Sequence, residues 1–217
     1  MKLRMGMGLA VGLGFAGIAS ATSLTFANVS GGPVSTLQLA DYGDRVTSAV
    51  MGDFSYGADQ GFTPNVVADY GDGTATWGAG YGSFSSCIWN QNATSANTSE
   101  ANPVRLTLTA DAGFLVRLHS LNLADWSGST NDQTTIQVLD GGNTVLNTLS
   151  LLPDTTTFTA LDYTASNLVA SSLTITWNNA WHTGGSDIVF SQEAVPEPVS
   201  LFVISGLAVA VLRRNRK

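Results

Sequence analysis

Hydrophobic and polar residues alternate along several short stretches of the middle of the chain. The clearest are residues 23–26, 104–108 and 173–177, and a period of two is typical of strands with one buried face. Runs rich in β-branched and apolar residues predict further strands at 34–39, 45–50, 65–69, 113–123, 134–139, 144–151, 156–161 and 187–191. About ten short strands without a helical period predict an all-β domain, a β-sandwich of jelly-roll type.

Glycine, proline and asparagine mark the breaks between these runs. The Asp-Gly-Gly-Asn sequence at 140–143 lies between two apolar stretches, which predicts a β-hairpin. Residues 81–103 are rich in serine, asparagine and threonine, and we expect them to form a long loop.

The first 21 residues have the composition of a targeting segment. Lys2 and Arg4 precede an uncharged run at 5–18, and Ala19-Ser20-Ala21 supplies the small-x-small pattern at which signal peptidase cleaves. The run is shorter than the roughly 20 apolar residues that a membrane-spanning helix needs. We therefore expect a removable signal helix, export of the protein, and a body that begins at residue 22.

The opposite end has three parts in a fixed order. Val195-Pro196-Glu197-Pro198 is followed by fourteen uncharged residues at 199–212 and by a basic end at 213–217. As a helix the apolar part would be about 21 Å long, short for a hydrocarbon core of about 30 Å. We expect a short transmembrane helix that spans by thinning the bilayer or by burying the residues on its proline side in the interface. The positive-inside rule would keep the basic end in the cytoplasm and the body, residues 22–194, outside the inner membrane.

This order of parts resembles the PEP-CTERM sorting signal over residues 195–217. The resemblance implies that an exosortase recognises and cleaves the tail near Pro196-Glu197-Pro198. It also implies a Gram-negative host that makes exopolysaccharide, and a destination in the cell envelope, on the surface or in the extracellular matrix.

Charge narrows the classes of partner. Residues 22–197 contain three arginines, no lysine and all sixteen acidic residues, a net charge of −13. Because such a surface repels phosphate, nucleic acid is not expected as a partner. The one cysteine, Cys87, excludes an intrachain disulfide framework.

Catalytic signatures are missing from the sequence, which favours a protein that is not an enzyme. Of the two histidines, His119 lies in an apolar strand pattern, whereas His182 lies in a Gly-rich stretch after Trp181 and is the better functional candidate. A polysaccharide hydrolase stays open as an alternative, since two carboxylates in one pocket could perform its chemistry.

Two copies of Ala-Asp-Tyr-Gly-Asp place acidic side chains beside glycines. They contribute Asp41 and Asp44 in one copy and Asp69 and Asp72 in the other. Calcium takes 6–8 oxygen ligands, often from loop carboxylates, so these residues are candidates for a structural calcium site, the only cofactor we expect. Aspartates that cap turns explain the same pattern.

The last strand, 185–191, resembles the final strand of galactose-binding-like jelly rolls. The resemblance implies a calcium-holding role for Asp187. Ile188 stands where the family pattern has asparagine.

Five tryptophans are the remaining candidates for binding. Trp177 ends an alternating strand and is expected in the core. Trp126 and Trp181 lie beside turn residues, where exposed rings could pack on the C–H faces of sugars, so these two and His182 are the candidate glycan-binding residues. The interpretation is an exported, non-enzymatic protein that binds exopolysaccharide; a purely structural matrix protein is the second alternative.

Overall fold

The computed structural model describes residues 21–26, 43–48, 63–94, 102–127 and 133–195. These residues form strands and turns without a helix, so the all-β prediction is confirmed. The described residues include no helix long and apolar enough to cross a membrane. The predicted signal helix, the strand at 34–39 and the apolar helix at 199–212 lie outside the described residues.

The larger sheet has seven strands and is built around two long ones. β7 (Phe114–Asp125) and β13 (Thr183–Ala194) pair antiparallel along their length. The other strands join this pair in the order β10-β7-β13-β5-β4, with β1 on β13 and β11 on β7. These five are β1 (Thr22–Leu24), β4 (Thr74–Trp77), β5 (Cys87–Asn90), β10 (Thr159–Asp162) and β11 (Val169–Ala170).

The smaller sheet has six strands in the order β2-β3-β6-β12-β8-β9. Its pairs are antiparallel except for β2 with β3, which are parallel. The strands are β2 (Val46–Ser48), β3 (Val66–Tyr70), β6 (Val104–Ala110), β8 (Thr134–Asp140), β9 (Val145–Leu151) and β12 (Ser172–Trp177).

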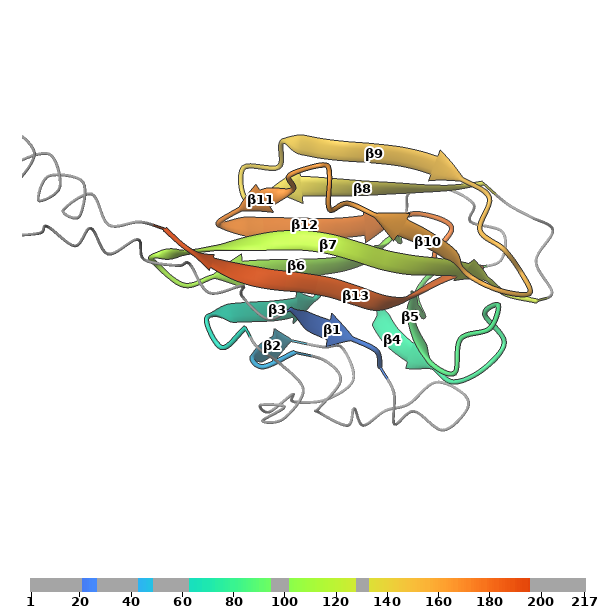
Figure 1. Cartoon of the computed structure of the whole chain (residues 1–217). Helices are drawn as coiled ribbons and strands as arrows, with labels where there is room; N and C mark the ends of the chain where they lie inside the picture. Colours follow the sequence, from blue (N-terminus) through green and yellow to red (C-terminus); the bar gives the residue numbers. More distant parts are fainter. Residues whose placement is uncertain (1–20, 27–42, 49–62, 95–101, 128–132, 196–217) are drawn as a thin grey trace, which may run out of the picture.

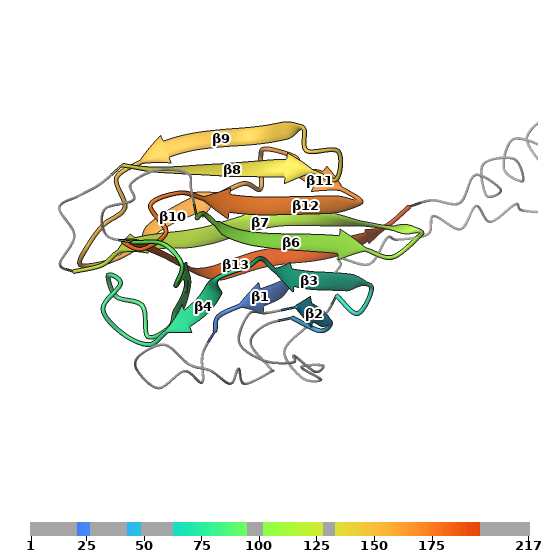
Figure 2. The ribbon, with the colours of Figure 1, turned by 180° about the vertical axis from the view of Figure 1, so that it is seen from behind.

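The two sheets pack as layers, as the opposite views in Figures 1 and 2 show. The main core lies between them and is formed by inward residues of both sheets, such as Leu106 and Ile175 from one and Leu118 and Phe190 from the other. Trp177 is 1% exposed in this core, which confirms its expected place. The alternation of buried and less buried residues along β6 and β8 follows from the strand period of two.

The predicted hairpin at residues 140–143 is confirmed. It joins β8 to β9, with the Asp140 amide donating to the Thr144 carbonyl at 2.9 Å. The Asp140 side chain accepts hydrogen bonds from the Gly142 and Thr144 amides, and Asn143 takes the left-handed backbone conformation with φ of 62°. Asparagine tolerates this conformation better than most residues, so the turn residues that the sequence offers are the ones that the turn requires.

The prediction of one long loop over residues 81–103 is wrong. Strand β5 lies inside it, its four residues are buried, and it pairs with both β4 and β13. The polar composition on either side of this strand conceals the short apolar run Cys-Ile-Trp. The pattern also does not predict β4 or the two-residue β11, which lie in stretches rich in glycine, threonine and serine where no alternation stands out.

Candidate functional site

A second hydrophobic cluster lies on the face of the seven-stranded sheet that points away from the main core. Ile88 of β5 belongs to the main core, whereas its neighbours Cys87 and Trp89 belong to the second cluster. Successive side chains of a strand point to opposite faces, so this cluster occupies the outer face. Its buried members are Ala75, Tyr81, Phe84, Cys87, Trp89 and Ala124, with Trp77 and Trp126 partly buried against them.

Five aromatic side chains of this region enclose a hollow of about 150 Å³. We call it the aromatic cradle; its residues are Trp77, Tyr81, Trp89, Trp126 and Trp181. It contains four of the five tryptophans in the protein. None of the five lining residues is charged.

The rings of the cradle form one continuous series of edge-to-face contacts. Trp181 meets Trp89 with ring centroids 5.0 Å apart, and Trp89 meets Trp77 at 5.4 Å. Trp77 meets Trp126 at 5.6 Å, and Trp126 meets Tyr81 at 5.3 Å. Each such pair is worth about 0.5–1.5 kcal/mol beyond the area it buries, so the rings hold one another in place.

Hydrogen bonds to the backbone fix the same residues. The Tyr81 hydroxyl donates to the Trp181 carbonyl at 2.6 Å, and the Trp77 indole donates to the Ala79 carbonyl at 2.8 Å. The Trp126 amide donates to the His182 carbonyl at 2.7 Å. The cradle is therefore arranged before any ligand arrives.

Two glycines allow the backbone to approach these rings closely. A Cβ on Gly184 of β13 would lie 2.6 Å from the Cys87 sulfur and 3.0 Å from the Tyr81 ring. Gly80, with φ of 116°, faces the Trp126 ring, and a Cβ there would lie 2.4 Å from it. Larger side chains at either position would displace the floor or the wall of the cradle.

Burial raises the pKa of two ionisable groups, Cys87 beneath the cradle and Tyr81 in its lining. Burial raises the pKa of the Cys87 thiol well above its usual range. The pKa of Tyr81 is raised first by burial and then by the nearby Cys87 and Asp125. Both groups are therefore neutral near pH 7 and are packing elements rather than nucleophiles or bases.

The indole N–H groups of the cradle differ in whether they have a hydrogen-bond partner and in how far they are buried. The Trp89 nitrogen is buried without a hydrogen-bond partner. Within the described part of the chain, the indole nitrogens of Trp126 and Trp181 also have none, and Trp181 is 37% exposed. The Trp89 N–H is enclosed by protein, so the N–H donors available to ligand oxygens at the cradle are those of Trp126 and Trp181, which are not fully buried.

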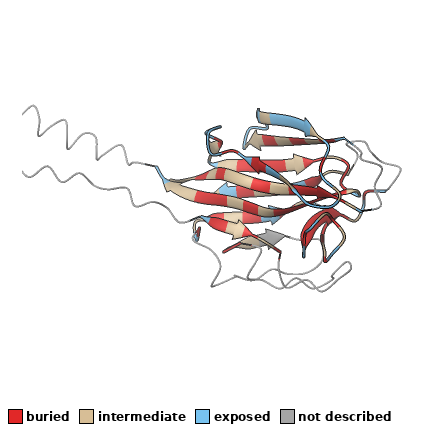
Figure 3. Cartoon of the chain, turned by 45° about the vertical axis from the view of Figure 1, so that its right-hand side comes forward, coloured by how far each residue is buried: buried red, intermediate tan, exposed pale blue. Residues whose placement is uncertain are grey.

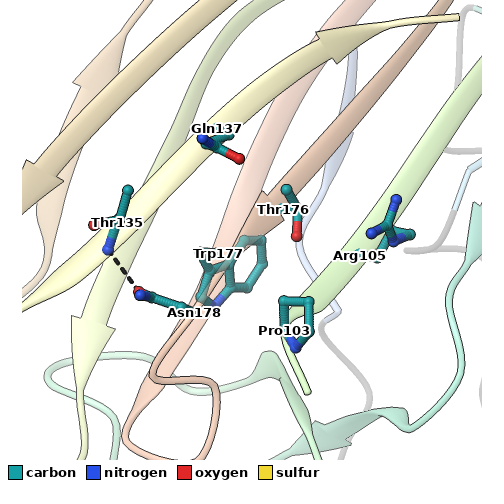
Figure 4. Close-up of a pocket in the computed structure, with 7 residues that line it drawn as sticks. All are labelled: Pro103, Arg105, Thr135, Gln137, Thr176, Trp177 and Asn178. Atoms are coloured by element: carbon teal, nitrogen blue, oxygen red, sulfur yellow. Dashed lines mark hydrogen bonds between the residues drawn. The ribbon is translucent and has the colours of Figure 1, made fainter. Parts of the chain in front are cut away.

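A second hollow, of about 160 Å³, lies on the outer face of the six-stranded sheet (Figure 4). We call it the polar shelf; its residues are Pro103, Arg105, Thr135, Gln137, Thr176, Trp177 and Asn178. Arg105, Thr176 and Gln137 are neighbours across β6, β12 and β8. The Asn178 side chain accepts a hydrogen bond from the Thr135 amide at 2.7 Å, as Figure 4 shows.

Arg105 is the arginine of the described region that has no ion pair there. Arg45 pairs with Asp111, and Arg117 pairs with Glu193. Arg105 also lines a larger hollow of about 410 Å³ together with Asp69 and Asp72. Both of these carboxylate side chains are exposed.

The remaining calcium candidates lie apart from this hollow. Asp44 is buried and accepts hydrogen bonds from the Thr63 amide at 2.6 Å and the Thr63 hydroxyl at 3.3 Å. Asp187 has φ of 49° at an irregularity in β13 and accepts from Asn122 at 2.9 Å. Asp41 lies outside the described residues.

The donor set for a metal is sparse. No group of three or more His, Cys, Asp or Glu residues suited to a metal ion occurs among the described residues. A structural calcium stays a prediction; thermal unfolding in calcium and in EDTA tests it, and an unchanged midpoint would contradict it.

The two histidines have different surroundings. His182 is half-buried in the turn between Asn179 and β13, next to Trp181. His119 lies 2.8 Å from the Ser191 hydroxyl, in β7 beside β13. Burial and then the neighbouring Arg117 lower the pKa of His119, partly offset by Glu193.

Of the processing residues, only Ala21 and Val195 are described. Ala21 is exposed immediately before β1. Val195 is 42% exposed, and its amide donates to the Gly113 carbonyl at 2.8 Å, directly after β13. Ala19 and Pro196-Glu197-Pro198 lie outside the described residues.

The cradle was only partly foreseen. The neighbouring turn residues select Trp126, Trp181 and His182 in the sequence, and the structure brings both tryptophans together with Trp77 and Trp89, which no turn residue selects. The signal that could have found Trp89 is the Cys-Ile-Trp-Asn run, whose alternation places Cys87 and Trp89 on one face.

Comparisons with known proteins give little further information. No family model matches the chain, and no curated protein matches it. Among solved structures it resembles that of the arabinose-bound MgGH51 α-L-arabinofuranosidase, with 12% identity and a TM-score of 0.35 over 58% of this chain and 23% of that one. A likeness this distant supports no inference about activity.

Proposed function

We propose that the domain is a non-enzymatic module that binds a neutral glycan in the aromatic cradle. The observation that carries this proposal is that four of the five tryptophans line one open hollow. Indole rings that served the core alone would be expected to bury fully, as Trp177 does, yet Trp181 is 37% exposed. Aromatic faces pack against the C–H faces of sugars, and the free N–H groups can donate to sugar oxygens.

The charge distribution favours a neutral sugar. The cradle has no charged lining residue, while the protein between residues 22 and 197 carries a net charge of −13. A polymer rich in carboxylates would be repelled before it reached the rings. Neutral hexose chains have no such barrier.

The sequences of the two terminal segments support a location outside the cytoplasm. Export through a cleaved signal peptide, and exosortase processing at Pro196-Glu197-Pro198, would deliver it to the envelope or the exopolysaccharide of a Gram-negative cell. The sandwich is further proposed to be of jelly-roll type. In support, successive strands β6, β7 and β8 alternate between the two sheets, as do β11, β12 and β13.

Affinity electrophoresis in gels that contain neutral polysaccharides tests the binding site. Trp181→Ala should abolish the retardation, because it removes the most exposed ring and leaves the other four in place. Phe158→Ala is a matched control, since Phe158 is 44% exposed and lies outside the cradle. Equal mobility of the wild type and Trp181→Ala with every polysaccharide would refute the proposal.

Sorting is tested separately in the native host. Replacing Pro196-Glu197-Pro198 with alanines should leave an uncleaved form in the membrane fraction, measured by immunoblotting. Normal release of that variant would exclude exosortase processing.

A hydrolase is the alternative that has an observation of its own, the hollow with Asp69 and Asp72. Hydrolase activity is tested by measuring the release of reducing ends from the polysaccharide that the wild type binds. Release that disappears in Asp69→Asn or Asp72→Asn would replace the binding proposal with a catalytic one. A purely structural matrix protein is less favoured, since Trp126 and Trp181 are not fully buried.

A further inference from the structure

The rings of the aromatic cradle stand at large angles to one another. The interplanar angle is 85° between Trp77 and Trp89 and 89° between Trp77 and Trp126. Tyr81 stands at 65° to Trp126, and Trp181 at 70° to Trp89. A flat platform for a sugar ring needs aromatic faces that are nearly parallel, whereas these rings close the hollow from several directions. Such an arrangement fits a compact, rounded group.

The hollow is small, and the strands behind it are well packed. Its volume of about 150 Å³ is close to that of about five water molecules, each of which occupies about 30 Å³ in the liquid. Every residue of β4 and β5 except Trp77 is buried (Figure 3). The cradle therefore has room for a group of a few heavy atoms and a firm support for the rings that would contact it.

The charge around the cradle is negative. Residues 22–197 carry a net charge of −13, which raises the local concentration of cations at the surface. Asp125, the residue before Trp126, is fully buried and lies near enough to Tyr81 for its charge to raise the Tyr81 pKa. The faces of aromatic rings are also the negative part of their quadrupole. A cation is therefore favoured both on approach and inside the cradle.

The lining distinguishes between kinds of cation. A primary ammonium group carries three N–H donors, which need acceptors when they leave water. The hydroxyl of Tyr81 is the one oxygen among the lining side chains, and Tyr81 is 3% exposed. A quaternary ammonium group has no N–H, so it loses no hydrogen bond when it enters.

We propose that the aromatic cradle binds a quaternary ammonium group of the trimethylammonium type that choline carries. Nitrogen with its four bonded carbons has the size of the hollow, and its charge is spread over methyl groups that rings on several sides can contact. Tryptophan is the strongest aromatic partner for a cation, and four of the five lining residues are tryptophans. This ligand class goes beyond the neutral glycan proposed above, and the inference rests on ring geometry and charge rather than on glycan binding.

Isothermal titration calorimetry of the full chain with three small compounds tests the proposal. Choline is compared with 3,3-dimethyl-1-butanol, which has the same shape with carbon in place of the charged nitrogen, and with ethanolamine, which has a primary ammonium group. We expect choline to bind at least about tenfold more tightly than either. Equal affinity for choline and the neutral alcohol, equal affinity for choline and ethanolamine, or no binding of choline would overturn the proposal.

Substitutions at the rim of the cradle locate the site. Trp181→Ala should weaken choline binding about tenfold, and Trp181→Phe should weaken it less, because it keeps a ring. Phe158→Ala is the matched control, since Phe158 is 44% exposed and lies outside the cradle. Equal effects of Trp181→Ala and Phe158→Ala would mean that choline binds elsewhere on the acidic surface, which would also overturn the proposal. Circular dichroism confirms that each variant is folded.

Competition separates this inference from the glycan proposal. Saturating choline should release the protein from a neutral polysaccharide that retards it, because both ligands would occupy the same rings; unchanged retardation would contradict the choline site. Retardation without any choline binding would overturn this inference alone, and choline binding without retardation by any polysaccharide would overturn the glycan proposal alone. Glycerophosphocholine distinguishes the sources of the group: tighter binding than choline would indicate a lipid headgroup, and weaker binding a free cation.

Discussion

The aromatic cradle and the polar shelf are hollows of similar size that are built in different ways. The cradle encloses about 150 Å³ and the shelf about 160 Å³. The cradle rests on its own hydrophobic cluster, so its rings contribute to stability and are held rigidly. The shelf is formed mainly by outward-facing side chains of β6, β8 and β12, and its Arg105 is exposed. Of the two hollows, only the cradle is lined by side chains that both stabilise the fold and form a rigid surface. This difference can be tested.

The largest effect is expected from Trp89→Ala. Trp89 is 5% exposed and contacts both Trp77 and Trp181, so its removal should cost about 3–5 kcal/mol of unfolding free energy. On the shelf, Gln137→Ala should stay within about 0.5 kcal/mol. Urea unfolding measures both, and Trp89→Phe, with a smaller loss, covers the case in which the alanine variant does not fold. Equal losses of unfolding free energy in Trp89→Ala and Gln137→Ala would contradict the difference in stability between the cradle and the shelf.

Gly184→Ala tests the close packing beneath the cradle. The added Cβ would meet the Cys87 sulfur at 2.6 Å and the Tyr81 ring at 3.0 Å. Overpacking of this kind costs about 1–3 kcal/mol. The matched control is Gly141→Ala in the β8–β9 turn, where the nearest atom is the Ser172 Cβ at 3.3 Å and the residue is exposed. A Gly184→Ala protein as stable as the control would show that the second hydrophobic cluster accommodates an added methyl group without strain.

The sequence was informative about the sandwich and less so about the cradle. The pattern predicts every described strand of five residues or more and some shorter ones, and it correctly places Trp177 in the core. It assigns a residue to a face of its own strand, but it does not say which strand becomes the neighbour. Trp89 and Trp181 are more than ninety positions apart in sequence, and their rings meet because β5 pairs with β13. Proximity of this kind depends on topology, which no local pattern contains.

Alkaline pH should lower the unfolding free energy of the domain through ionisable groups of the cradle and not of the shelf. The pKa values of Cys87 and Tyr81 are raised above their ordinary values of 9.0 and 10.0. The folded state therefore keeps protons that the unfolded state releases, so stability is intact below about pH 9 and falls as pH rises above it. Each group contributes a slope approaching about 1.4 kcal/mol per pH unit.

Urea unfolding at pH 8, 9 and 10 gives the measurement. Cys87→Ala should reduce the loss of unfolding free energy between pH 9 and pH 10. Arg105→Ala on the shelf should leave the dependence of the unfolding free energy on pH as in the wild type. A Cys87→Ala protein with the wild-type slope would show that the thiol does not carry this dependence.

The smallest effect is expected when a ring is added to the shelf. Gln137→Trp places an indole among Arg105, Thr176 and Asn178. The one aromatic ring among the residues that line the shelf is Trp177, which is buried. A ring that is not held by its neighbours loses rotamer freedom when it binds, at a cost of about 0.5–1.5 kcal/mol. That cost is comparable to the gain from one stacking contact. We therefore expect Trp181→Ala/Gln137→Trp to remain unretarded in gels that retard the wild type. Restored retardation would mean that any exposed tryptophan on this sandwich suffices, and that the edge-to-face series of the cradle serves stability alone.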